Sequence, residues 1–276
     1  MANDKKRLKA NSLQSADEIL LIERRGWRRV GFQVGLVLLV ILLCAWLTDM
    51  LDVRRMSEGI PAIGTLLTEM FPPDFTEAES WLRPMIDTIA MSVAGTALSI
   101  VLSLPLGILA ARNTTPNPTT YRIARGILNV FRSIPELIMG IVFVAAVGFG
   151  ALPGVLALGL HSIGMVGKFF SEAIEHAHEA PVEAARAAGA NKIQVITHGI
   201  MPQVMPQFAD VTMYRWEYNF RASTVMGMVG AGGIGLELIA SLRLMQYKEC
   251  FAILLSILLM VTIVDALSAV LRKRFK

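Results

Sequence analysis

Long runs without a formally charged residue are the feature of this sequence that most limits what it can fold into. One run covers residues 30–48 and another covers 88–111. A third, 137–167, is too long for one membrane crossing and too short for two. A helix of about 20 apolar residues crosses the hydrocarbon core of a bilayer. These runs therefore predict an all-α membrane protein that crosses the bilayer several times.

Composition supports this prediction and excludes several classes of protein. Charged residues make up 17% of the 276 residues and hydrophobic residues make up 54%, whereas about a quarter of a soluble domain is charged. An ordinary soluble enzyme and a disordered chain are therefore excluded. The sequence contains no GxxxxGK[ST] loop for ATP phosphates. It also has no Cys/His cluster with metal spacing and no basic, aromatic stretch suited to nucleic acid.

We expect a charged cytoplasmic segment at residues 1–29 and a membrane domain at 30–276 with about six spans. The expected spans are residues 30–48, 86–111, 127–148, 155–175, 206–223 and 250–271. Six spans place the basic segments (1–29, 112–125, 176–200 and 272–276) on one side and the more acidic connection 49–83 on the other. Because basic loops stay in the cytoplasm, both termini are predicted to be cytoplasmic.

A glycine-rich stretch, residues 222–236, follows the fifth expected span. It carries no charge, but its glycines make a straight helix improbable, so we expect a kinked or re-entrant segment buried in protein. Gly230, Gly232 and Gly233 are candidates for a gate or hinge. Close packing of helices against this segment is the alternative explanation for the glycines.

The polar segment 178–202 carries a specific pattern. Glu183-Ala184-Ala185 is followed by Gly189, and Pro202 comes thirteen residues after that glycine, directly before a span. The alanines leave a helix surface without bulky side chains, which can enter a groove on a partner, and Gly189 permits a sharp reversal. The alternative is a generic amphipathic cytoplasmic helix.

This spacing resembles the EAA loop of ABC importer permeases, although Gly199 and Met201 stand where that family usually has Ile and Leu. Four further motifs resemble the phosphonate branch of the family, and the resemblance covers about residues 70–276. They are Phe71-Pro72-Pro73-Asp74-Phe75, Arg132-Ser133-Ile134-Pro135-Glu136, Tyr214-Arg215-Trp216-Glu217 and the stretch 221–235.

The resemblance implies a type I ABC importer permease fold in the cell inner membrane and import of phosphonates or the closely related phosphite. It further implies a homodimer of permease chains, two ATP-binding subunits and an extracytoplasmic substrate-binding protein. Glu183, Ala184, Ala185 and Gly189 would then dock the ATPase. The chain itself would not be an enzyme and would hold no cofactor, because ATP and Mg²⁺ belong to the partner ATPase.

Charged residues inside the expected spans are the remaining candidates for function, since such charges are costly and usually face a bundle interior or a wet cavity. Arg132 and Glu136, and likewise Glu217 and Arg221, are spaced i,i+4 and can pair. Such pairs could simply lock helices together. They could instead line a path for an anion, because guanidinium groups suit phosphorus oxyanions. The candidate pathway residues are Arg221, Ser223, Thr224, Arg132 and Glu217.

Three other functions stay open at this point. Within the importer family, the substrate could be a methionine-like amino acid or another small anion. An ion-coupled secondary transporter would use intramembrane acids as carriers, and the candidates are Asp87, Glu136, Glu217 and Asp265. An integral membrane enzyme would need a cluster of catalytic side chains near one interface, and the sequence shows none. His161 is expected to have a structural role.

Overall fold

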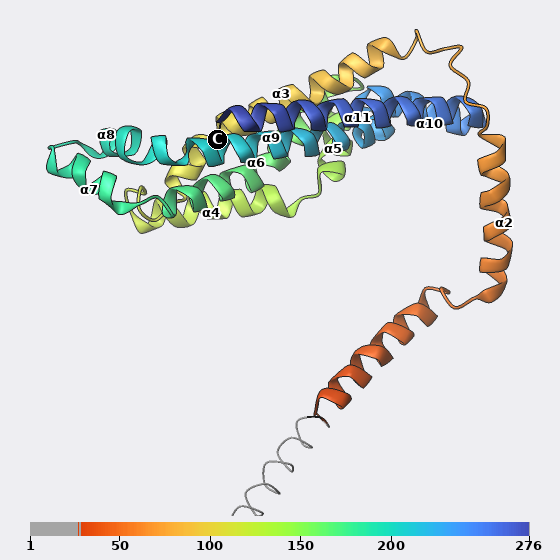
Figure 1. Cartoon of the computed structure of the whole chain (residues 1–276), viewed down its shortest axis with the longest axis horizontal. Helices are drawn as coiled ribbons and strands as arrows, with labels where there is room; N and C mark the ends of the chain where they lie inside the picture. Colours follow the sequence, from red (N-terminus) through yellow and green to blue (C-terminus); the bar gives the residue numbers. More distant parts are fainter. Residues whose placement is uncertain (1–26, 28, 276) are drawn as a thin grey trace, which may run out of the picture. The chain divides into compact units, whose positions relative to one another are not determined.

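The computed structural model describes residues 27 and 29–275 (Figure 1). The expected cytoplasmic segment 1–29 therefore lies almost wholly outside the described residues. The described chain is helical, with no β-strand in the part that the structure covers. It divides after Thr65 into two compact units, which are described separately.

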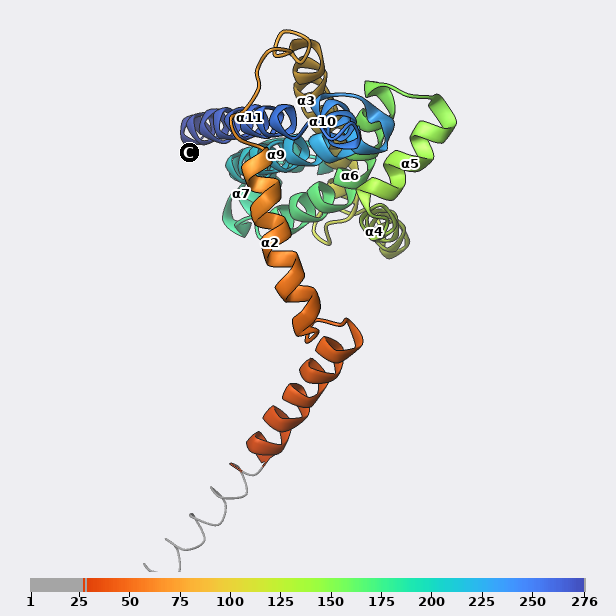
Figure 2. The same ribbon diagram turned by 90° about the vertical axis from the view of Figure 1, so that its right-hand side faces the viewer.

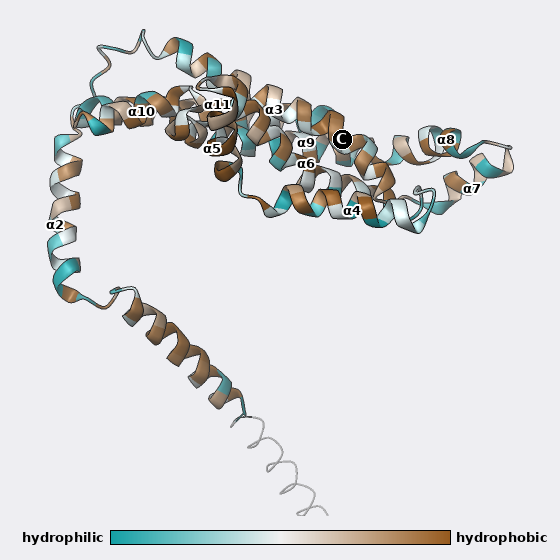
Figure 3. Ribbon diagram, turned by 180° about the vertical axis from the view of Figure 1, so that it is seen from behind, coloured by the Kyte–Doolittle hydropathy of each residue, from teal (hydrophilic) through white to brown (hydrophobic). Residues whose placement is uncertain are grey.

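The first unit contains an apolar helix, Arg29–Leu47, and most of helix α2, Val53–Glu69. No residue of Arg29–Leu47 is buried by the described chain, and the helix is hydrophobic along most of its length (Figure 3). Its length and composition fit one membrane crossing.

Helix α2 lies within the connection 49–83, for which the sequence predicted no helix. The Oδ1 atom of Asp52 accepts a hydrogen bond of 3.0 Å from the backbone N–H of Arg54, which caps the first turn. Apolar residues then recur at helical spacing, at Met56, Ile60, Ile63 and Leu67, although all of them are exposed. The helix was missed because its apolar residues alternate with polar ones instead of forming a run.

The second unit is a bundle built around three long helices, α3 (Leu82–Leu109), α6 (Ala151–Glu175) and α9 (Met201–Met226). Figure 2 shows α6 and α9 at its centre, with α11 on one side and α4 and α5 on the other. Glycines on α6 let neighbouring backbones approach closely, as small residues do in membrane bundles. A Cβ atom on Gly164 would lie 2.6 Å from the backbone nitrogen of Arg132.

The third expected span, 127–148, is not one helix. The structure has α4 (Pro118–Ser133) and α5 (Glu136–Val147), bent by 85° at the intervening residues. Pro135 is the cause, because it cannot donate to the helical ladder and it disfavours helical geometry in the residue before it. Ile134 is accordingly extended, with φ −94° and ψ 118°.

Six further elements complete the second unit. They are α7 (Glu179–Ala187), α8 (Lys192–Gln194), the π-helix η1 (Val195–Ile200), the π-helix η2 (Gly227–Ala231), α10 (Ile234–Arg243) and α11 (Tyr247–Phe275). Helices α7 and α8 form one end of this unit, and α10 lies toward the other (Figure 1). Over the described residues, four helices are long and apolar enough to cross a membrane, or six if each bent pair counts as one span.

Candidate functional site

The segment 178–202 folds as a helix–turn–helix projection at one end of the second unit (Figure 1). Helix α7 ends in a Schellman motif. The N–H of Ala190 donates to the carbonyl of Ala185 at 3.1 Å, and the N–H of Gly189 donates to that of Arg186 at 2.9 Å. Gly189 has φ +81°, which is the left-handed conformation that such a reversal requires. The predicted reversal at Gly189 is therefore present.

A capping box starts the next helix. The side chain of Asn191 accepts a hydrogen bond of 3.0 Å from the N–H of Gln194, and the side chain of Gln194 accepts one of 2.8 Å from the N–H of Asn191. The chain then widens into the π-helix η1 and continues directly into α9, with Pro202 in the first turn of α9.

Helix α7 is fastened to η1 and α9 by the side chain of Gln203 and by apolar packing of Val182. Gln203 accepts a hydrogen bond of 2.9 Å from the N–H of His178, and its side-chain amide donates to the carbonyls of Gly199 and His178. A Cβ atom on Gly199 would lie 3.3 Å from the Cα atom of Val182. Glycine at position 199, which departs from the family pattern, thus provides the space in which α7 packs.

The four docking residues predicted from the sequence lie together on this projection. Glu183 and Ala184 are exposed, Ala185 is half-buried, and Gly189 forms the turn. Their outer surface is small and uncharged apart from Glu183. This shape can enter a groove on another protein, and the projection reaches beyond the bundle to do so (Figure 1).

The intramembrane charges pair differently from the sequence prediction. Glu217 forms an ion pair with Arg272 on α11, not with Arg221. Arg221 lies 3.0 Å from Asp265 on α11. Glu217 and Arg221 lie on α9, and each contacts a residue of opposite charge on α11, which packs beside α9. The predicted Glu217–Arg221 pair is therefore wrong.

The Arg132–Glu136 pair is wrong as well, because the bend at Pro135 separates the two residues. Arg132 is exposed and forms no ion pair with any described residue. Glu136 instead accepts a hydrogen bond of 2.6 Å from the hydroxyl of Tyr218 and lies 3.2 Å from Nε2 of His161. The other ring nitrogen of His161 lies 3.0 Å from the carbonyl oxygen of Ile134. His161 thus ties the broken helix to α6, in line with the structural role expected for it.

Ser223 and Thr224 do not join Arg221 in a cluster. Ser223 is buried and its hydroxyl donates to the carbonyl of Phe220 at 2.7 Å, with the carbonyl of Thr88 at 3.3 Å. The hydroxyl of Thr224 donates to the carbonyl of Arg221 at 2.7 Å. Both hydroxyl protons are therefore used by backbone carbonyls. The structure does not bring the five candidate pathway residues into one site.

A buried polar network, absent from the predicted site, joins three helices, α3, α6 and α9, through Arg215 and Asn219 of α9. Nε of Arg215 donates to the hydroxyl of Ser162 at 2.7 Å, and its guanidinium lies 4.2 Å from the centre of the Tyr218 ring. Asn219 donates to the hydroxyl of Thr96 at 2.9 Å. Nη2 of Arg215 is buried without a partner among the described residues. The sequence signals were the density of polar residues in the fifth span and the motif Tyr214-Arg215-Trp216-Glu217, neither of which identifies the partners of Arg215.

The glycine-rich stretch is kinked, as expected. Gly230, Gly232 and Gly233 have φ +96°, +76° and +76°, and the axis bends by 59° between η2 and α10. The N–H of Ile234 donates to the Thr88 hydroxyl at 2.9 Å, which fixes the start of α10 against α3. These glycines are required for the backbone conformation. Their movement as a gate stays a prediction.

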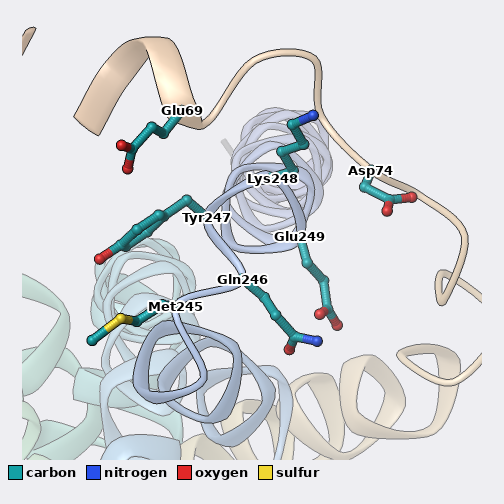
Figure 4. Close-up of a pocket in the computed structure, with 7 residues that line it drawn as sticks. All are labelled: Glu69, Asp74, Met245, Gln246, Tyr247, Lys248 and Glu249. Atoms are coloured by element: carbon teal, nitrogen blue, oxygen red, sulfur yellow. The ribbon is translucent and has the colours of Figure 1, made fainter. Parts of the chain in front are cut away.

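The opposite end of the second unit holds a cavity of about 440 Å³ (Figure 4). Its lining residues are Glu69, Asp74, Met245, Gln246, Tyr247, Lys248 and Glu249. Hydrogen bonds from the hydroxyl and backbone N–H of Thr76 lower the pKa of the Asp74 carboxyl below its ordinary value. Three carboxylates and one ammonium group thus give this end a mixed, mainly acidic surface.

Comparison with known proteins gives concordant matches. The family described as "Binding-protein-dependent transport system inner membrane component" matches residues 103–276. The chain is 66% identical to the phosphite transport system permease protein PtxC of Stutzerimonas stutzeri, over 91% of this chain and 90% of that protein. It is 39% identical to the phosphate-import permease protein PhnE of Mycolicibacterium smegmatis, over 83% of this chain and 43% of that protein.

The fold also has solved counterparts. A chain of the methionine ABC transporter MetNI, solved in inward-facing conformations, aligns with a TM-score of 0.62 and 23% sequence identity. The alignment covers 73% of this chain and 99% of that one. At this identity the likeness concerns the arrangement of helices, which is that of a type I ABC importer permease.

Proposed function

The chain belongs to the inner membrane components of binding-protein-dependent transport systems, and we propose that it is the permease subunit of an ATP-driven importer of phosphite. We infer the substrate from the 66% identity, over 250 residues, to a phosphite transport permease. Phosphonates are the related substrates to test beside it. As a permease the chain provides the passage, and the energy comes from a partner ATPase.

The projection at segment 178–202 is the proposed ATPase contact. Its support is structural: a small exposed face at Glu183 and Ala184, an ordered turn at Gly189, and attachment to α9 through Gln203. A force applied to α7 reaches α9 through these contacts. Helix α9 in turn holds α11 through two ion pairs and holds α3, α5 and α6 through Arg215, Tyr218 and Asn219.

The remaining partners follow from the same proposal. A second copy of the chain completes the passage, and an extracytoplasmic binding protein delivers the substrate. Segment 178–202 and both termini face the cytoplasm, as the distribution of basic residues indicates. The end that carries the cavity of Figure 4 then faces outward, toward the binding protein.

Uptake into vesicles tests this function. The permease, its ATPase and its binding protein are reconstituted, and uptake of phosphite, methylphosphonate and phosphate is compared with and without ATP inside. We expect ATP-dependent uptake, fastest for phosphite. Uptake driven by an ion gradient, with the ATPase omitted, would show a secondary transporter and refute the proposal.

A further inference from the structure

A second pocket lies beside the docking projection, at the end of the second unit that carries α7 and α8. Its volume is about 240 Å³. The residues that line it are Asn113, Thr114, Thr115, Arg186, Ala190, Lys192, Val195, Ile196 and Ile200. One wall is thus the loop between α3 and α4, and the other is the segment that runs from α7 to η1.

The second wall carries the cations. Arg186 and Lys192 line the pocket, and neither forms an ion pair or a side-chain hydrogen bond with a described residue. Of the described lining residues, none is acidic. Arg125 of α4 differs from these two cations, because its Nη2 atom lies 3.0 Å from Oε1 of Glu175 in an ion pair. The pocket therefore presents two uncompensated positive charges, which favour an anionic ligand.

The loop wall offers oxygen acceptors, with one amide proton of Asn113 beside them. The hydroxyl of Thr114 donates to the carbonyl of Ile108 at 2.5 Å, and that of Thr115 donates to the carbonyl of Asn117 at 3.2 Å. The side-chain amide of Asn113 donates to the carbonyl of Ile174 at 2.6 Å. With both hydroxyl protons and one of the two Asn113 amide protons engaged, the three side chains retain oxygen lone pairs. A ligand that accepts hydrogen bonds on one side and donates one on the other fits both walls.

A singly protonated phosphorus oxyanion meets this requirement. Its charged oxygens accept from Arg186 and Lys192, and its P–OH group donates to the oxygens of the loop. The pocket also has an apolar floor of Val195, Ile196 and Ile200, which suits the P–H of phosphite or the carbon of a phosphonate. Sulfate at neutral pH has no hydroxyl to donate, and neither does the headgroup of phosphatidylcholine.

We propose that this pocket is a cytoplasmic binding site for a protonated phosphorus oxyanion, which bridges the loop 113–115 and the docking segment. The identity of the anion rests on the proposed function, since the transported phosphite would be released on this side. Occupancy of the site would then connect the amount of imported product to the position of α7.

The test uses the full chain in nanodiscs of phosphatidylcholine, at a pH where phosphite is singly protonated. Binding is measured by the broadening of the phosphite ³¹P resonance. The double variant Arg186→Gln, Lys192→Gln should bind at least about tenfold more weakly, because two charge-assisted contacts are lost. Arg122→Gln is the matched control, since Arg122 is an exposed arginine of the neighbouring helix α4 that does not line the pocket. It should bind like the natural chain.

Two further measurements locate and identify the ligand. Phosphite should slow hydrogen exchange at residues 113–115 and 190–196 in the natural chain but not in the double variant. Sulfate should not compete, and replacing part of the lipid with phosphatidylglycerol should leave phosphite binding unchanged.

Equal binding by the double variant, or competition by sulfate, would overturn the proposal. Loss of phosphite binding in phosphatidylglycerol would overturn it in favour of a lipid headgroup. These outcomes do not depend on uptake, so a chain that imports phosphite without binding it here refutes the site alone.

Discussion

The docking projection and the membrane interior are held together in opposite ways. The projection is fixed by bonds between near neighbours in sequence, such as Ala190 to Ala185 and the reciprocal capping of Asn191 and Gln194. The interior is fixed by partners far apart, such as Asn219 with Thr96, 123 residues away. The projection can therefore keep its shape while it moves, whereas the interior helices must move with their partners.

Reversing the charge of the docking helix should have the largest effect. We expect Glu183→Lys to abolish ATP-dependent phosphite uptake while the protein still inserts, because Glu183 is the exposed charge on the proposed contact surface. Uptake and co-purification of the ATPase are measured together. Glu79→Lys, a reversal at another exposed acid far from the projection, should leave co-purification of the ATPase normal. Normal ATPase co-purification with Glu183→Lys would contradict the docking role.

Breaking one long-range contact should destabilise the interior without touching the projection. Tyr218→Phe removes the hydrogen bond to Glu136, and the cost of leaving a charged acceptor with one partner fewer is about 1–3 kcal/mol. Thermal unfolding in detergent should show the loss. Tyr214→Phe is the matched control, because Tyr214 lies one turn away on the same helix and its side chain is half exposed. Equal melting temperatures for the two variants would show that the hydrogen bond to Glu136 adds no stability.

Breaking a local feature should have a smaller effect, confined to the projection. Gly189→Ala places a Cβ atom on a residue with φ +81°, at a cost of about 1–2 kcal/mol. Hydrogen exchange at 186–194 should accelerate while α3 and α6 are unchanged. Gly189→Asn should be milder, because asparagine tolerates this conformation better. Faster exchange across the whole bundle would show that the two regions are not independent.

The smallest effect is expected from the Arg221–Asp265 pair, whose side chains are 45% and 46% exposed. The effect is expected to be small because the test exchanges the two charges and does not remove the pair. The double variant Arg221→Asp, Asp265→Arg keeps the pair with its charges exchanged. If the pair only joins α9 to α11, phosphite uptake should recover in the exchange relative to Arg221→Asp alone. Failure to recover would assign Arg221 to the path of the anion.

The same distinction between local and long-range contacts separates what the sequence predicts from what it does not. The all-α fold and the membrane location depend on local composition, and the docking turn depends on residues within one motif. These features could therefore be predicted from the sequence. The pairing of Glu217 with Arg272 and of Arg221 with Asp265 could not. Helical spacing shows that two side chains can meet, but it does not show whether a second helix offers a nearer partner.

The broken third span shows a further limit. The bend of 85° next to Pro135 removes the i,i+4 relationship on which the Arg132–Glu136 prediction depended. The Arg215 network was missed for a related reason. The buried Arg215 contacts the hydroxyl of Ser162 and the ring of Tyr218, neither of which a search for opposite charges identifies.

The attachment of α7 by Gln203 has a consequence for how the projection responds to ionic strength. The amide of Gln203 and its backbone partners at His178 and Gly199 are all neutral. Added salt screens exposed charges but has little effect on such bonds. In concentrated salt the docking projection should therefore stay attached to α9, even when charge-dependent contacts between it and the ATPase weaken.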